Sequence, residues 1–329
     1  MAHPTDKPTI KAVAKRAGVS EATVSRAMNG SPLVKPETKQ RIESIIHEMG
    51  YRPNILARSM RTNQSKTIGV VISSVTNAFF TAIIGAIQEA AADQGYSVII
   101  TNTDENPDHE KAAIQMLQGH MVAGFIIAST SRLTDYHALL GPDPAVFIDR
   151  EPGGQADHDY DSLLVDNTAG AQAVVETLIA QGATRIGMIA SGVSTAGQER
   201  LRGYLRALQA HGMPYDPDIV YFSDVQQTKA RQHTSQLLIN QACDGLFAAD
   251  VTLIQAALAE IEARHLTHIK LGAFDNVVWF DYLSQPVTTA EQPTDQMGHQ
   301  AVNLLIDRIK GRSSQPTILR LPTRLIKRG

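Results

Sequence analysis

Residues 9 to 50 repeat apolar positions with the period of an α-helix, in three short runs. The first run predicts a helix whose apolar face consists of Ile10, Val13, Ala14 and Ala17. Gly18 ends this helix because glycine tolerates the left-handed backbone of a sharp turn. Ser20 is placed to cap a second helix over residues 21–28 with its hydroxyl oxygen. Two short helices joined by such a turn predict a helix-turn-helix, whose second helix fits the DNA major groove.

The third run predicts another helix, which starts at Pro36 and ends at Gly50. We therefore expect a three-helix headpiece over residues 1–53. Residues 54–66 follow as a short hinge helix and a polar linker, with Leu56, Ala57 and Met60 on one face of the helix. A helix of this length is marginal alone and needs a partner or DNA to order it.

From residue 67 onward, short apolar runs alternate with helical patterns. The expected strands cover residues 67–72, 97–102, 124–127, 145–148, 163–165, 185–190, 219–222, 245–248, 270–274 and 287–290. The expected helices cover residues 78–94, 108–118, 168–181, 195–211, 229–240, 253–264 and 295–310. This alternation predicts an α/β fold with two lobes, each a parallel sheet covered by helices on both faces. We assign residues 67–165 and 293–310 to the first lobe and residues 166–290 and 312–329 to the second. Ligands of such sheets bind beyond the carboxyl ends of the strands.

Charge is distributed unevenly along the chain. Up to Lys66 there are 12 Lys and Arg against 5 Asp and Glu, whereas the remainder has 18 against 28. A basic head on an acidic body indicates that the head meets a polyanion. The 329 residues include one cysteine, Cys243, so an intrachain disulfide is impossible. No apolar run approaches the roughly 20 residues of a membrane-spanning helix. We expect a cytoplasmic protein with no membrane contact.

Several longer motifs follow one another between residues 9 and 298. They are AGVSEATVSRAMNG, VKPETKQRI, GYRPN, LARSMR, SKTIGVV, TNAFF, FIDR, RLRGYLRAL, AFDN, TTAEQP and QMG. In this order they resemble the lactose/galactose repressor (LacI/GalR) family. The resemblance implies a helix-turn-helix headpiece on a two-lobed core like that of periplasmic binding proteins. It also implies a transcriptional regulator, most often a repressor, whose affinity for its operator is switched by a small molecule.

The resemblance implies a homodimer on double-stranded, pseudo-palindromic operator DNA. Bases would be read by Glu21, Ala22 and Arg26, and Arg26 suits guanine because a guanidinium reaches O6 and N7 together. Glu21 either accepts a hydrogen bond from a cytosine amino group or is only an N-terminal acidic residue that the helix dipole favours. The candidate phosphate contacts are Thr9, Ser20, Thr23, Ser25, Asn29 and Thr38. In the family the hinge helices pair in the minor groove, where Met60 stands in place of the usual leucine.

Polar and aromatic residues near the expected strand ends form a candidate effector pocket. They are Asn77, Phe79, Phe80, Asp149, Arg150, Arg200, Asp250, Asp275 and Gln292. Carboxylates, amides and guanidiniums hold hydroxyl groups, and aromatic faces cover C–H edges, so a sugar is the expected ligand. Arg150 and Arg200 are also suited to a carboxylate or phosphate, so a sugar acid or a sugar phosphate stays an alternative ligand. Two positions depart from the family: Val225 replaces an aromatic stacking residue, and Asp250 adds a negative charge.

Catalytic and metal-binding motifs are not found in the sequence. There is no GxxxxGK[ST] loop, no HExxH and no clustering of the 11 histidines. We therefore expect no enzyme activity, no metal and no cofactor. Two alternatives to a sugar-switched regulator stay open: a regulator controlled by a protein partner, and a ligand-binding protein with no DNA role.

Overall fold

The computed structural model describes residues 8–28, 31–51, 65–153, 159–191, 194–223 and 227–328. The chain forms two compact units, Met1–Gln64 and Ser65–Gly329. Asn29, Val225 and the predicted hinge helix with Leu56, Ala57 and Met60 lie outside the described residues. Among the residues that are described, no helix is long and apolar enough to cross a membrane.

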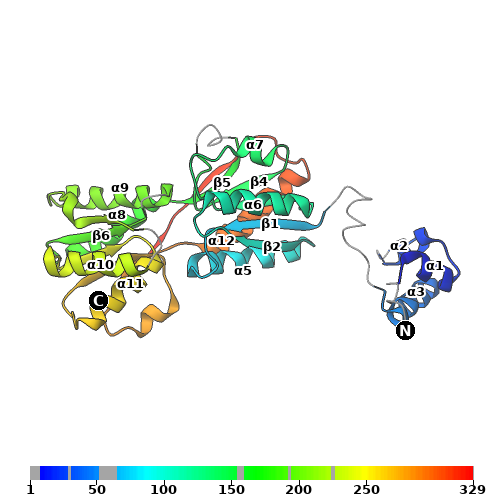
Figure 1. Ribbon diagram of the computed structural model, residues 1–329, viewed down its shortest axis with the longest axis horizontal. Helices are drawn as coiled ribbons and strands as arrows, with labels where there is room; N and C mark the ends of the chain where they lie inside the picture. Colours follow the sequence, from blue (N-terminus) through cyan, green and yellow to red (C-terminus); the bar gives the residue numbers. More distant parts are fainter. Residues whose placement is uncertain are drawn as a thin grey trace. The chain divides into compact units, whose positions relative to one another are not determined.

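The headpiece consists of three helices, as the apolar periodicity predicts (Figure 1). They are α1 (Ile10–Ala17), α2 (Glu21–Met28) and α3 (Pro36–Met49). Gly18 and Gly50 end α1 and α3 with φ angles of 65° and 60°, the left-handed backbone expected of them. The Ser20 hydroxyl accepts a hydrogen bond from the Thr23 amide at 3.2 Å, which confirms the predicted cap. The helices enclose a small core of Val13, Ala14, Ala17, Val24, Ala27 and Ile42.

The first lobe of the larger unit is built on a sheet whose six strands are all parallel. Their order is β11-β5-β4-β3-β1-β2. The strands are β1 (Thr67–Ile72), β2 (Ser97–Asn102), β3 (Gly124–Ile127), β4 (Ala145–Ile148), β5 (Asp161–Val165) and β11 (Ile318–Leu321). The helices are α5 (Ala78–Asp93), α6 (Pro107–Gly119), α7 (Tyr136–Leu140) and α12 (Thr294–Ile309). Helices α5 and α12 cover one face of the sheet, and α6 and α7 cover the other (Figure 1).

The second lobe repeats this arrangement in the order β12-β10-β9-β8-β6-β7, with only β12 antiparallel to its neighbour. Its strands are β6 (Ile186–Ala190), β7 (Val220–Phe222), β8 (Gly245–Ala248), β9 (Lys270–Phe274), β10 (Val287–Glu291) and β12 (Arg324–Ile326). Its helices are α8 (Asn167–Ala180), α9 (Thr195–Ala210), α10 (Gln227–Ser235) and α11 (Val251–Ala263). Short 3₁₀ turns η2 (Pro217–Ile219) and η4 (Val278–Tyr282) and a π-helical turn η3 (Gln236–Asn240) complete the lobe.

The assignment of residues 312–329 to the second lobe is wrong for one strand. Ile318–Leu321 pair with β5 in the first lobe, and the chain then crosses to β12. The periodicity also missed α7 and η4, which are too short to show a repeat. Three connections therefore join the lobes: β5 to α8, β10 to α12, and β11 to β12.

A side chain on β11 reinforces the junction between the lobes. The Arg320 guanidinium contacts Glu151 of the first lobe at 2.8 Å and Glu199 of α9 at 3.0 Å. Both contacts are partly exposed to solvent, so we take them as a modest contribution that orients the lobes rather than a large stabilising energy.

Helices α5 and α12 approach so closely that a side chain at Gly298 has no space. A Cβ there would lie 2.4 Å from the Ala86 Cβ and 2.9 Å from the Ile87 amide nitrogen. We expect Gly298→Ala to lower the free energy of unfolding by about 1–3 kcal/mol through overpacking. Gly85→Ala on the exposed face of α5 meets nothing within 4 Å, and should raise stability by about 0.5–1 kcal/mol. Urea unfolding measures the free energy of unfolding of both variants. Equal effects of the two substitutions would contradict the close packing of α5 against α12.

Candidate functional site

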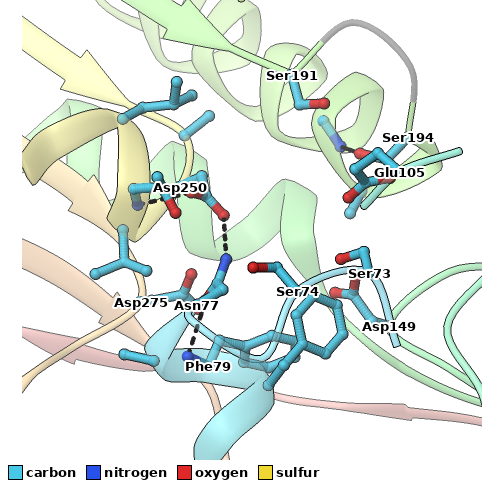
Figure 2. Close-up of a pocket in the computed structure, with 18 of the residues that line it drawn as sticks. Ser73, Ser74, Asn77, Phe79, Glu105, Asp149, Ser191, Ser194, Asp250 and Asp275 are labelled. Atoms are coloured by element: carbon cyan, nitrogen blue, oxygen red, sulfur yellow. Dashed lines mark hydrogen bonds between the residues drawn. The ribbon is translucent and has the colours of Figure 1, made fainter. Parts of the chain in front are cut away.

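A cavity of about 510 Å³ lies between the two lobes of the larger unit. Its wall is made by loops at the carboxyl ends of strands from both sheets, where ligands of parallel sheets bind. Figure 2 shows Asp250 and Asp275 on one side of the opening and Glu105, Ser194 and Asp149 on the other. The site therefore combines side chains that are far apart in the sequence.

Three helices begin at the cavity, and each is capped by a lining side chain. The Asn77 side-chain oxygen Oδ1 accepts from the Phe79 amide at 2.9 Å at the start of α5. The Ser194 hydroxyl accepts from the Gly197 amide at 3.0 Å at the start of α9. Asp250 accepts from the Thr252 amide at 2.7 Å at the start of α11. These caps satisfy the free amides of the first turns and fix each lining residue in place.

One hydrogen bond crosses the cavity between two of these caps. The Asn77 side-chain amide of the first lobe donates to Asp250 Oδ2 of the second lobe at 3.2 Å (Figure 2). Both Asp250 oxygens are thus engaged, one with its own helix and one with Asn77. The contact forms only when the lobes are close together, so it belongs to a closed arrangement.

Asp149 and Asp275 hold equivalent places in the two lobes. Asp149 follows β4 and Asp275 follows β9, and their backbone amides donate to Leu163 O and Ala290 O of the next strand at 3.0 and 2.9 Å. Both have positive φ angles, 65° and 72°, which are uncommon for residues with a side chain. These matched, strained turns bring two buried carboxyl groups to the cavity wall.

The Arg150 guanidinium is bound within the protein. It makes a bidentate pair with Glu105, at 2.6 and 2.7 Å, and its Nε donates to Asp149 at 3.1 Å. A further bond runs to the Ser129 carbonyl at 3.2 Å. Because its donors are used by these neighbours, Arg150 offers little to an anionic ligand.

Arg200 is buried on α9 and joins three elements of the second lobe. Its Nε donates to Asn167 Oδ1 at 2.8 Å and its Nη1 donates to the Ala249 carbonyl at 2.7 Å. The guanidinium lies 3.8 Å from the centre of the Phe274 ring, within range of a cation–π interaction. Arg200 therefore holds together the start of α8 and the ends of β8 and β9.

The cavity wall has more acidic than basic side chains. Four lining carboxyl groups face two lining guanidiniums among the described residues. Burial raises the pKa of Asp149, with Arg150 and Arg200 opposing the shift. Burial raises the pKa of Asp275 to about 7, again against Arg200 and reinforced by Asp250. Burial alone would raise the pKa of Glu105, but its bonds to Arg150 outweigh this and hold the pKa below its usual value.

All nine candidate effector residues line this cavity. Phe79 and Phe80 also belong to the core of the first lobe, where they are 6% and 2% exposed. Gln292 donates to Asp275 at 2.5 Å, and its own Oε1 is buried without a hydrogen-bond partner. The structure thus brings the nine residues together, while their role in binding stays a prediction.

Several lining residues were not among the sequence candidates. They are Ser73, Ser74, Thr76, Glu105, Ser191, Ser194, Ser223, Thr252, Gln255 and Trp279. Position alone could have found Ser73 and Ser191, which directly follow β1 and β6. Glu105 and Trp279 gave no such signal, because they lie in an irregular loop and a 3₁₀ turn.

In the headpiece, α2 presents its candidate base-reading residues to solvent. Glu21, Ala22 and Arg26 are exposed, while Val24 and Ala27 are buried against the other helices. Thr23 and Ser25 are half-buried, and the Thr23 hydroxyl pairs with that of Ser20 at 2.9 Å. The exposed Thr9 hydroxyl caps α1 by accepting from the Ala12 amide at 3.2 Å. The second helix therefore has one face for the core and one that is open to a partner.

Both units of the chain are similar to known protein families. Residues 9–54 match the family of bacterial regulatory proteins of the lacI family, and residues 175–329 match the periplasmic binding protein-like domain. The HTH-type transcriptional regulator CelR of Thermobifida fusca is 31% identical, over 98% of each chain. A solved CelR–cellobiose complex has a TM-score of 0.73 at 28% identity, covering 97% of this chain and 98% of the other. The lac repressor dimer bound to operator and the anti-inducer ONPF has a TM-score of 0.84 at 26% identity, covering 98% of each chain.

The fold and its two sites define a transcriptional regulator with a helix-turn-helix headpiece and a ligand-binding core. The chain belongs to the lacI family of bacterial regulatory proteins. This confirms the fold class and the family inferred from the motifs.

The buried Asp275 should make stability depend on pH. A carboxyl whose pKa is raised by folding binds its proton more tightly in the folded state, so stability falls as pH rises from 3.8 toward about 7. Asp275→Asn removes this loss, because the amide stays neutral, tolerates a positive φ and still accepts from Gln292. We expect a higher melting temperature than wild type at pH 8 and little difference near pH 4.

The matched control is Asp93→Asn, which changes an exposed carboxyl group at the end of α5. Its melting temperature should follow wild type at every pH. If Asp275→Asn also followed wild type from pH 4 to pH 8, the carboxyl group of Asp275 would not carry the burial penalty.

Proposed function

We propose that the protein is a homodimeric, sequence-specific DNA-binding repressor whose operator affinity is switched by a small uncharged sugar held between the lobes. The observation that carries the effector part is the cavity wall, in which buried carboxyl groups converge while Arg150 is paired with Glu105 and Arg200 is held by Asn167 and the Ala249 carbonyl. Both lobes supply residues to this wall, so an occupant would change how the lobes fit together.

The charge and hydrogen bonding of the wall support an uncharged ligand over a sugar acid or phosphate. An added anion would face Asp149, Asp250 and Asp275, while Arg150 is paired with Glu105 and Arg200 already donates through its Nε and Nη1. Sugar hydroxyls are suited to such a wall because each can donate to a carboxylate. The resemblance to the CelR–cellobiose complex, whose ligand is a neutral sugar, supports the same choice.

The headpiece supports the DNA-binding part of the proposal. The exposed Arg26 on α2 is the side chain best suited to guanine, with Glu21 and Ala22 one turn earlier. A dimer would place two such helices on half-sites about one helical turn apart, in a pseudo-palindromic operator. The similarity to a lac repressor dimer on its operator supports this arrangement. We infer no catalytic role, and we place the protein where bacterial operator DNA lies, in the cytoplasm.

Loss of the Arg26 side chain should weaken sequence-specific DNA binding. The operator is first selected from a randomised duplex pool, and affinity is then measured by fluorescence anisotropy at fixed salt. Arg26→Ala should weaken binding to this operator by roughly 5- to 150-fold, the equivalent of about 1–3 kcal/mol for one bidentate base contact. Binding to unrelated duplex DNA should change little.

The control removes an equal charge elsewhere in the headpiece. Lys39→Ala on α3 deletes a partly exposed cation that pairs weakly with Glu43 at 3.8 Å. It should lower specific and non-specific affinity by the same small factor, as an electrostatic term does. If Arg26→Ala behaved like Lys39→Ala, Arg26 would contact only phosphates.

A bound effector should raise the melting temperature of the core by mass action. Neutral sugars such as cellobiose, glucose, galactose and ribose are tested at pH 8 beside gluconate and glucose 6-phosphate. We expect a rise of several degrees with one or more neutral sugars and none with the two anions. Asp275→Asn should reduce the rise, because the amide accepts less strongly from a hydroxyl than a carboxylate does.

Two comparisons complete this experiment. Asp93→Asn should keep the full response to the sugar, and operator affinity with and without the sugar gives the sign of the switch. A response to the anions alone would overturn the uncharged-sugar assignment. No response to any sugar would favour control by a protein partner instead.

A further inference from the structure

The cavity needs an apolar surface as well as polar groups if it is to hold a sugar ring. The C–H faces of a ring favour contact with a flat aromatic side chain. Phe79 and Phe80 reach the wall but are buried in the core of the first lobe, where they pack edge-to-face at 5.0 Å. Most of their surface is therefore used within the protein.

The turn η4 brings a third aromatic residue to the wall from the second lobe. Trp279 lines the cavity and is half-buried. Its neighbours in the turn point elsewhere, since Val278 is 73% exposed and Phe280 is 1% exposed in the core of this lobe. The indole contacts the Phe280 ring edge-to-face at 4.5 Å, so it is supported from the core side.

Polar groups that could hold ring hydroxyls line the same cavity. Gln255 and Thr252 come from the first turns of α11, beside Asp250 at its N-cap. Val251 and Leu253 extend the apolar part of the wall. An aromatic surface with amide and carboxylate groups in the same wall is the combination that binds sugar rings.

We propose that Trp279 is a specificity-determining residue, whose indole forms the surface against which the C–H face of the effector ring lies. This inference rests on the proposed sugar-binding function and names the residue that selects a cyclic, uncharged sugar. The indole supplies dispersion and burial of apolar surface without any charge. It therefore favours a ring over an open-chain polyol with the same hydroxyl groups.

Trp279 is the only tryptophan of the chain, so its fluorescence reports on this wall directly. In the full-length protein, the neutral sugar giving the largest rise in melting temperature is titrated while tryptophan emission and its quenching by acrylamide are followed. We expect the sugar to change the emission and to reduce quenching, because the ring covers the indole. Sorbitol, an open-chain polyol, should have little effect on either signal.

Three variants separate a binding role from a packing role. Trp279→Ala should weaken affinity for the sugar about tenfold by calorimetry, the equivalent of about 1.4 kcal/mol. Trp279→Phe should lose less, because a smaller ring remains. Val278→Ala, in the same turn but exposed, should bind as wild type does. Melting temperatures without ligand show whether each variant is folded, and Trp279→Phe keeps the comparison valid if Trp279→Ala is not.

The outcomes distinguish this inference from the proposed function. If a neutral sugar binds but Trp279→Ala and Trp279→Phe bind it as wild type does, with unchanged indole quenching, the role of Trp279 is overturned and the sugar-binding function stands. Binding of sorbitol as tight as that of the cyclic sugar would also overturn it. If no neutral sugar binds wild type, the proposed effector class and this inference fail together.

Discussion

The buried guanidinium of Arg200 is the interaction on which the second lobe and its part of the cavity wall depend. It joins α9 to the start of α8 through Asn167, to the end of β8 through the Ala249 carbonyl, and to the Phe274 ring at the end of β9. Its charge also opposes the burial penalty on Asp149 and Asp275, which face the cavity from opposite lobes. Without Arg200, these two acids would be buried with less compensation, and the junction would lose a hydrogen-bonded anchor.

The second lining arginine, Arg150, is neutralised by an acidic neighbour, and this pairing narrows the class of ligand that suits the cavity. Glu105 binds Arg150 through both carboxylate oxygens, so the pair is nearly neutral as a unit. The sequence left the Arg150 guanidinium available for an anionic ligand. In the structure it is bound by Glu105, which lies 45 positions away in the chain. What remains for a ligand is a wall rich in acceptors, and such a wall suits hydroxyl donors better than anions.

The sequence predicted those parts of the fold that depend on local patterns. The three headpiece helices and strands such as β1 and β8 follow from apolar periodicity, together with Gly18, Gly50 and the Ser20 cap. The nine cavity residues could be chosen because parallel strands place their carboxyl ends together and because the motifs resembled a family. Glu105, Trp279 and the pairing of β11 with β5 could not be found, since each depends on contacts between distant segments.

The first strand of the core connects the two activities along the chain. β1 begins at Thr67, directly after the linker, and the chain beyond its other end supplies Ser73, Ser74 and Asn77 to the cavity wall. Asn77 then donates across the cavity to Asp250 of the other lobe. An occupant that strengthens or replaces this bond changes the balance between open and closed lobes, and the chain enters the first of these lobes at β1. Coupling therefore requires only that operator binding favour one of these two arrangements, and the strength of the switch is set by how differently the occupant binds them.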